Sequence, residues 1–188
     1  VIHALSVLGF KLEGQVIRRH PGYGMDDRLM LDRVDFAAGT VSLDTGVYPL
    51  TRCDFPTIDP AGDRYALTEA EAALVEEYVS AFRESQPLRR HLDFIYRRGS
   101  TYLCCNGNLL YHGCIPMRPD GGFDTVLLDG RPLSGRAYLD AIDKQLPTAF
   151  FGAPGAPARD EAPAYNRYLW PGPRSPLFGT THPAHLAP

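Results

Sequence analysis

A histidine followed by a glycine, at the end of an apolar run, is the pattern in this sequence that most directly suggests chemistry. His112 and Gly113 come directly after the apolar residues 109–111. A glycine beside a histidine allows a backbone or a ligand to approach closely, and loops at strand ends are where α/β folds place their sites. Neutral imidazole binds Mn, Fe and Zn. His112 is therefore a candidate metal ligand, and a half-buried histidine that hydrogen-bonds its surroundings is the alternative that spacing leaves open.

Basic side chains near the N-terminus are candidates for holding a phosphate group. They are Lys11, Arg18, Arg19, His20 and Arg28. Such side chains pair well with phosphate oxygens. Acidic residues are interleaved with them, namely Glu13, Asp26, Asp27 and Asp32. A solvated, salt-bridged surface is therefore the alternative interpretation, and the sequence does not say which of these side chains meets a substrate.

The cysteines and the last histidines do not form a recognisable metal site. The chain has four cysteines, Cys53, Cys104, Cys105 and Cys114, and the adjacent pair lacks the C-x-x-C spacing of zinc sites. We expect reduced, mostly buried thiols. His182 and His185 are spaced i, i+3, but they lie in a proline-interrupted segment, which argues against a helix that would bring them together.

Local patterns predict the elements that must position these residues. Residues 2–19 carry Leu5, Leu8, Leu12 and Val16 at helical spacing, and His20 with Pro21 ends that helix. Residues 40–50 alternate as a hairpin. Thr68 and Glu71 form a capping box, which begins a helix that Pro87 interrupts before a second helix.

The segment around His112 is predicted to be a strand, a turn and a strand. Residues 102–105 and 109–112 are apolar runs, and residues 106–108 join them. Asn106 and Asn108 are interpreted as turn formers, with orientation of His112 as the alternative. Ser134 begins a further helix that Pro147 ends. The mixture of helices and strands predicts an α/β fold of mixed α+β type.

Composition bounds the class of protein. The chain has 188 residues, 44% of them hydrophobic, which suffices for one domain with a core. A net charge of −3 argues against nucleic-acid and anionic-membrane partners. The sequence has no apolar run of about 20 residues and no signal-peptide pattern, so we expect a cytoplasmic protein. Nine of the seventeen prolines fall in residues 147–188; residues 148–188 are therefore predicted to be an irregular Pro/Gly-rich segment that follows a main part, residues 1–147.

Several motifs in one order resemble those of the class III fructose-1,6-bisphosphatases. These motifs are residues 10–15, 19–21, 25–28, 54–60, 106–116, 168–170 and 175–179. The family is similar to the metallophosphoesterases, which hold two divalent metal ions on Asp, His and Asn side chains. The resemblance implies a calcineurin-like sandwich of sheets and helices, of which this chain would form a part with a helical segment. It also implies that His112 is a metal ligand.

The same resemblance implies the reaction. The enzyme would hydrolyse fructose 1,6-bisphosphate to fructose 6-phosphate and phosphate in gluconeogenesis, using two divalent cations, of which Mn²⁺ is favoured. Two cations activate a bridging water and neutralise charge on the attacked phosphoryl group. The implied partner is a small sugar bisphosphate, and association as a homo-oligomer stays open.

The family's other ligand motifs are missing from this sequence. It contains no D-x-H, G-D-x-x-D-R, G-N-H-D or G-H-x-P. We therefore expect this chain to be a central part of a longer enzyme, with exposed apolar faces and no activity by itself. Two alternatives remain: a related phosphatase acting on another phosphate ester, and a non-catalytic region that serves packing or subunit contacts.

Overall fold

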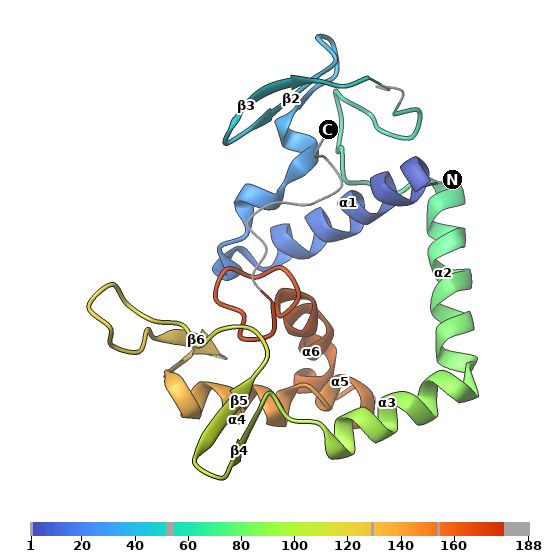
Figure 1. The fold of residues 1–188 in the computed structure, drawn as a ribbon. Coiled ribbons are helices and arrows are strands. Elements are labelled where there is room, and N and C mark those ends of the chain that lie inside the picture. Colours follow the sequence, from blue (N-terminus) through green and yellow to red (C-terminus); the bar gives the residue numbers. More distant parts are fainter. Residues whose placement is uncertain (1, 52–54, 129, 154, 179–188) are drawn as a thin grey trace. The chain divides into compact units, whose positions relative to one another are not determined.

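The computed structural model describes residues 2–51, 55–128, 130–153 and 155–178. These residues divide into two compact units, residues 2–85 and residues 86–178, which are described separately. Both contain helices and small antiparallel sheets (Figure 1), so the chain has the mixed α+β character expected. Among the helices described here, none combines the length and the apolar character needed to traverse a bilayer.

The first unit begins with helix α1 (Ile2–Arg19), which ends at the predicted His20 and Pro21. Three short 3-10 helices follow, η1 (Pro21–Tyr23), η2 (Asp26–Arg28) and η3 (Met30–Arg33). Strands β1 (Val34–Asp35), β2 (Thr40–Leu43) and β3 (Gly46–Pro49) form an antiparallel sheet. This sheet contains the predicted hairpin, and helix α2 (Glu69–Glu84) completes the unit.

The buried face of α1 overlaps the predicted one only in part: Leu8 is buried, and Leu12 and Val16 are partly buried. Val7, Lys11, Gly14 and Ile17 are buried at helical spacing, whereas Leu5 is 44% exposed. Val7 packs in a cluster with buried residues from three later segments: Leu31, Ile58 and Tyr65. Apolar spacing alone locates the buried face incompletely because it counts neither a lysine nor a glycine as a core residue. Both are buried here because of partners far along the chain.

The second unit contains four helices and two hairpins. Helix α3 (Gln86–Arg98) is followed by β4 (Tyr102–Cys105) and β5 (Asn108–Tyr111), then by β6 (Val126–Leu128) and β7 (Arg131–Leu133). Helix α4 (Gly135–Gln145) buries the predicted residues Tyr138, Leu139 and Ile142. Ser134 is its N-cap residue but makes no capping hydrogen bond.

The expectation of irregular structure beyond residue 147 is wrong for much of that segment. Helices α5 (Thr148–Phe151) and α6 (Pro157–Tyr168) lie within it (Figure 1). Pro157 stands in the first turn of α6, where a missing N–H costs nothing. Tyr165 and Tyr168 are buried, and their packing offsets the disruption by Pro163 inside the helix. Proline counting misses this because the position of a proline in a helix decides its effect.

Candidate functional site

The β4–β5 hairpin carries His112 at its exit. Asn106 and Gly107 form the two-residue loop of the hairpin, with φ values of 51° and 76°. Asn followed by Gly is the residue pair that this kind of tight turn favours. The turn interpretation of Asn106 is confirmed, and Asn108 is the first residue of β5. The turn thus sets the register that brings β5 to an end immediately before His112.

The imidazole of His112 is anchored at one nitrogen. Nδ1 lies 2.7 Å from the carbonyl oxygen of Leu177. A carbonyl oxygen only accepts hydrogen bonds, so Nδ1 must donate, and in a neutral ring the proton then sits on Nδ1. Nε2 keeps its lone pair. The ring of Phe178 stands edge-on to the imidazole, with 5.1 Å between centroids, and limits its rotation.

Gly113 allows the segment that anchors His112 to come close. Its N–H donates to the carbonyl oxygen of Pro176 over 3.0 Å. A Cβ at this position would lie 2.8 Å from the carbonyl carbon of Leu177 and 2.9 Å from its oxygen, and would also collide with the Pro176 oxygen. A side chain does not fit there. The expected close approach beside the histidine is confirmed, and the approaching backbone is the chain's own.

The state of His112 fits a metal ligand. Histidine ligands commonly donate the other ring N–H to a backbone carbonyl, which selects the tautomer and directs the ring. His112 is exposed among the described residues. Across residues 2–51, 55–128, 130–153 and 155–178, no group of three or more His, Cys, Asp or Glu side chains is placed to hold a metal ion. His182 and His185 lie outside the described residues.

The hairpin next to His112 is attached at its base and exposed elsewhere. At the base, the Thr101 N–H donates to Asp143 Oδ1 (2.7 Å) and the Tyr102 hydroxyl to Asp140 Oδ1 (2.7 Å), both on α4. Apolar side chains along the strands are exposed by about half, at Leu103 (59%), Leu109 (45%), Leu110 (55%) and Tyr111 (48%). An isolated two-stranded hairpin is marginally stable in water. This apolar hairpin is therefore suited to a partner surface.

The expectation of buried cysteines is wrong for the described ones. Cys104, Cys105 and Cys114 are free thiols and exposed, because the hairpin that bears the first two is itself uncovered. Cys114 is partly shielded: its thiol donates to the Ser175 carbonyl oxygen over 3.2 Å. Desolvation raises the pKa of this thiol. Cys53 lies outside the described residues.

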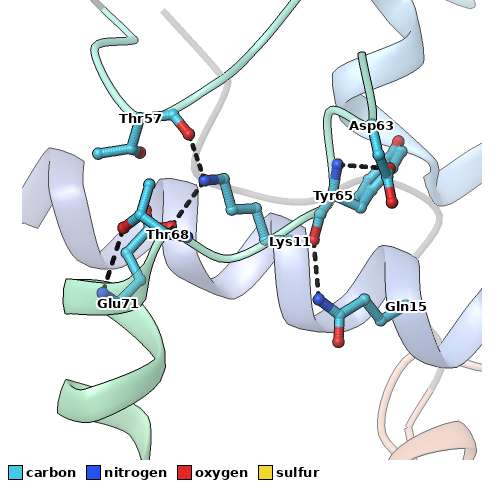
Figure 2. A network of polar contacts seen from close by, with 7 residues as sticks. All are labelled: Lys11, Gln15, Thr57, Asp63, Tyr65, Thr68 and Glu71. Carbon is cyan, nitrogen blue, oxygen red and sulfur yellow. Dashed lines mark hydrogen bonds and ion pairs between the residues drawn. The ribbon is translucent and has the colours of Figure 1, made fainter.

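Lys11 is buried and does not belong to a solvated surface. Its side chain is 0% exposed, and its Nζ donates to the Thr57 carbonyl oxygen (2.5 Å) and to Glu71 Oε2 (2.7 Å), as Figure 2 shows. A lysine so enclosed is not available to a phosphate group. Spacing could not reveal this, because Glu71 is 60 residues away in sequence.

The capping box of α2 is tied to Lys11 through Glu71. The Glu71 N–H donates to Thr68 Oγ1 (3.2 Å), and the Thr68 N–H donates back to Glu71 Oε2 (2.8 Å) (Figure 2). The predicted capping box is confirmed. Burial acts to raise the pKa of Glu71, but hydrogen bonds from Lys11 and Thr57 and from the Thr68 backbone outweigh it and lower that pKa. The carboxylate is thus held in its charged form.

The other basic side chains near the N-terminus are also engaged. Arg28 is buried and donates to Glu13 Oε1 over 3.2 Å, with side chains 9% and 6% exposed. Arg18 is exposed, and it pairs with Asp63 over 2.7 Å. The interpretation as a solvated, salt-bridged surface is therefore correct for Arg18. It is wrong for Arg28, because the ion pair of Arg28 with Glu13 is buried. A buried pair of this kind is a structural element, so Arg28, like Lys11, is not available to a phosphate group.

Sequence reasoning did not identify the partners of His112. The carbonyl oxygen of Leu177 carries no side-chain signal, and it lies 65 residues from His112 in sequence. Residues 175–178 stood out only as part of a motif of the resembled family, without a role. Trp170 contacts Phe178 with 4.4 Å between centroids and so packs against the ring that stands next to His112.

Comparisons with known proteins bear on this site. The family model described as Firmicute fructose-1,6-bisphosphatase matches residues 1–185. A protein of Clostridium novyi named "Fructose-1,6-bisphosphatase class 3" is 44% identical over 176 residues, which are 94% of this chain and 26% of that protein. Proteins of the same name from Porphyromonas gingivalis (44%, 93% of this chain and 27% of that protein) and Alkaliphilus metalliredigens (43%, 94% and 27%) are similar. The chain spans about a quarter of the length of these relatives, and no solved structure matches it.

Proposed function

Since the chain belongs to the Firmicute fructose-1,6-bisphosphatase family, we propose that it serves in the hydrolysis of fructose 1,6-bisphosphate to fructose 6-phosphate and phosphate. The relatives' printed name supports the substrate. The observation that carries the chemistry is the anchored imidazole of His112, whose Nδ1 lies 2.7 Å from the Leu177 carbonyl oxygen. Nε2 of His112 is the atom that would bind a divalent cation.

The role of the chain's own residues is to keep Nε2 of His112 unprotonated and oriented for a cation. The Leu177 carbonyl keeps the ring proton on Nδ1, and Phe178 holds the ring plane. When bound, a pair of divalent cations, for which we propose Mn²⁺, supplies the positive charge that activates water and neutralises the phosphoryl oxygens. His112 then contributes one oriented, uncharged ligand to that pair.

The remaining ligands are proposed to come from a longer polypeptide that contains this chain, here called the full-length form. One imidazole does not hold two cations, and the relatives are about four times as long as the matched segment. The exposed apolar side chains of the β4–β5 hairpin support a covering surface next to His112. In the full-length form, the small sheets described here would belong to a larger sandwich of sheets and helices.

The test is hydrolysis of fructose 1,6-bisphosphate in the presence of Mn²⁺. We expect the full-length form to be active and the 188-residue chain to be silent. His112→Ala in the full-length form should lose most activity, about 10²-fold or more, because it removes a metal ligand. His91→Ala is the matched control, since His91 is an exposed histidine of α3. Full activity of the His112→Ala enzyme, or turnover by the 188-residue chain, would refute the proposed role. Comparison with other sugar phosphates separates this activity from that of a related phosphatase.

A second candidate function is contact between subunits. Helix α2, which the structure describes throughout, has no buried residue, and it exposes Tyr78 (46%) and Phe82 (65%) on one face. Exposed aromatic side chains of this size favour an interface. Sedimentation of the full-length form with Tyr78→Ser and Phe82→Ser tests this candidate, since loss of a homo-oligomer without loss of the fold supports it. An unchanged oligomeric state would exclude this face.

A further inference from the structure

A single buried hydroxyl group organises the turn that faces His112. Ser175 is 1% exposed. Its Oγ donates to the Leu169 carbonyl oxygen over 2.5 Å. The same oxygen accepts the Leu177 N–H (3.1 Å) and the Phe178 N–H (3.3 Å). One side chain therefore holds three backbone groups of residues 169–178.

Two of these three groups belong to the residues that contact the imidazole. The Leu177 carbonyl shares one planar peptide with the Phe178 N–H, so the bond from that N–H to Ser175 Oγ limits how far the carbonyl oxygen can turn away from His112 Nδ1. The Leu177 N–H, held by the same oxygen, fixes the preceding peptide, so the backbone is restrained on both sides of the Leu177 Cα. The geometry of the imidazole thus depends on a hydroxyl that does not touch it.

The strand exit and the turn are also joined directly. The N–H groups of Gly113 and Cys114 both lie near the Pro176 carbonyl oxygen, at 3.0 and 3.3 Å, and the Cys114 thiol donates to the Ser175 carbonyl oxygen. These bonds hold the backbones together. Their acceptors are the carbonyl oxygens of Ser175 and Pro176, so they do not act on the Leu177 carbonyl itself. The direction of that carbonyl is set within the turn.

We propose that Ser175 is a positioning residue, which holds the Leu177 carbonyl against His112 so that the proton stays on Nδ1 and Nε2 faces a cation. The inference rests on the proposed function of His112 as a metal ligand. In water, the neutral histidine side chain favours the tautomer with the proton on Nε2. The Leu177 hydrogen bond must therefore reverse the ordinary preference, and the Ser175 hydroxyl keeps that bond in place.

The first test reads the tautomer of His112 directly. The 188-residue chain is labelled with ¹⁵N at histidine, and long-range ¹H–¹⁵N spectra are recorded at about pH 8.5, where histidine side chains are neutral. The His112→Gln variant identifies the signal. In the unmodified chain we expect the Nδ1–H form. In Ser175→Ala we expect its ratio to the Nε2–H form to fall roughly fivefold or more, the effect of losing about one hydrogen bond.

Control variants separate positioning from general damage. Ser134→Ala makes the same change at an exposed serine with no capping bond and should leave the tautomer ratio unchanged. Ser175→Thr keeps the hydroxyl and should restore the Nδ1–H form. If Ser175→Ala does not fold, Ser175→Cys replaces it, since a thiol has similar size but is a weak donor and acceptor. An unchanged tautomer ratio in a folded Ser175→Ala or Ser175→Cys chain would overturn the proposal.

The second test connects the turn to the cation. Binding of Mn²⁺ to the full-length form is measured by calorimetry, and we expect Ser175→Ala to weaken it by about 10- to 100-fold. If His112→Ala abolishes binding while Ser175→Ala leaves both affinity and tautomer unchanged, the positioning role is wrong and the proposed function stands. If Ser175→Ala changes the tautomer while His112→Ala leaves Mn²⁺ binding intact, the proposed function of His112 is wrong instead.

Discussion

Helix α1 offers two glycines whose replacement by alanine should change stability in opposite directions. In a helix interior, alanine is favoured over glycine by about 0.8–1.0 kcal/mol. Gly9 is exposed, and a Cβ there meets no atom within 4 Å. Gly9→Ala should therefore raise the free energy of unfolding by nearly the full amount, about 0.5–1 kcal/mol.

Replacing Gly14 by alanine would bring the same gain in helix propensity, but there is no space for a side chain at this position. A Cβ there would overlap Cδ1 and Cε1 of Tyr65 and lie 2.9 Å from its Cγ. The Tyr65 ring is 0% exposed and lies beneath the Arg18 guanidinium, 4.3 Å from its centroid. Burial also raises the pKa of Tyr65 to about 12, as expected for a desolvated ring. The ring therefore has little room to move.

The two effects at Gly14 can be weighed. Overpacking of a filled core costs about 1–3 kcal/mol, and an overlap with a buried ring belongs near the upper end. Subtracting the gain of about 1 kcal/mol in helix propensity leaves Gly14→Ala less stable than the parent by about 2 kcal/mol. The two variants of one helix should thus differ by about 3 kcal/mol.

Urea unfolding followed by far-UV circular dichroism measures this difference. Fluorescence of Trp170, the single tryptophan, reports the unit of residues 86–178. If the two units unfold separately, the circular dichroism transition without a matching fluorescence change belongs to the unit of residues 2–85. The free energy of that transition is then compared between the variants. A Gly14→Ala chain as stable as the parent would refute the packing of Tyr65 on α1. A destabilised Gly9→Ala chain would refute the exposure of that side of the helix.

Three further predictions concern the buried ion pair and the thiols. Lys11→Met should destabilise the chain by about 2–4 kcal/mol in urea unfolding, because it leaves the Glu71 carboxylate without its cation; a loss below about 0.5 kcal/mol would contradict the pairing. The pKa of Glu71 is lower in the folded chain than its ordinary value of 4.5. Its contribution is therefore complete above pH 4.5 and lost as pH falls through the lower folded pKa, so the stability difference between the parent and Glu71→Gln should shrink on acidification. For the thiols, a chain with only Cys104 should react with a disulfide reagent at pH 8 faster than a chain with only Cys114, because the pKa of the Cys114 thiol is raised by desolvation. Equal rates would show that the Ser175 turn does not shield Cys114.

Local sequence patterns predicted several element boundaries. The end of α1 at His20 and Pro21, the capping box of α2 and the turn at Asn106 and Gly107 all depend on residues within a few positions of one another. At that range, steric and hydrogen-bonding preferences depend directly on the residue types. Helix α6 was missed because its proline content was counted without regard to where each proline stands in the helix.

Which residues are buried was decided by the tertiary structure. Lys11 is enclosed because Thr57 and Glu71, 46 and 60 residues away, accept its hydrogen bonds. No periodicity in α1 contains that information, so the predicted apolar face was only partly correct. Cys104 and Cys105 are exposed for the opposite reason, since the described residues do not cover the hairpin that bears them.

The candidate site divides in the same way. The sequence alone pointed to His112 and to Gly113, because a histidine and a glycine at a strand end have limited uses, and its motifs indicated the family that the comparisons then showed. The sequence alone did not predict the tautomer of His112. That property depends on the direction of one backbone carbonyl, at Leu177, which is 65 residues away and whose peptide is held by Ser175 through the Phe178 N–H. Backbone direction is a product of the folded turn, and only the tertiary structure could place it against the ring.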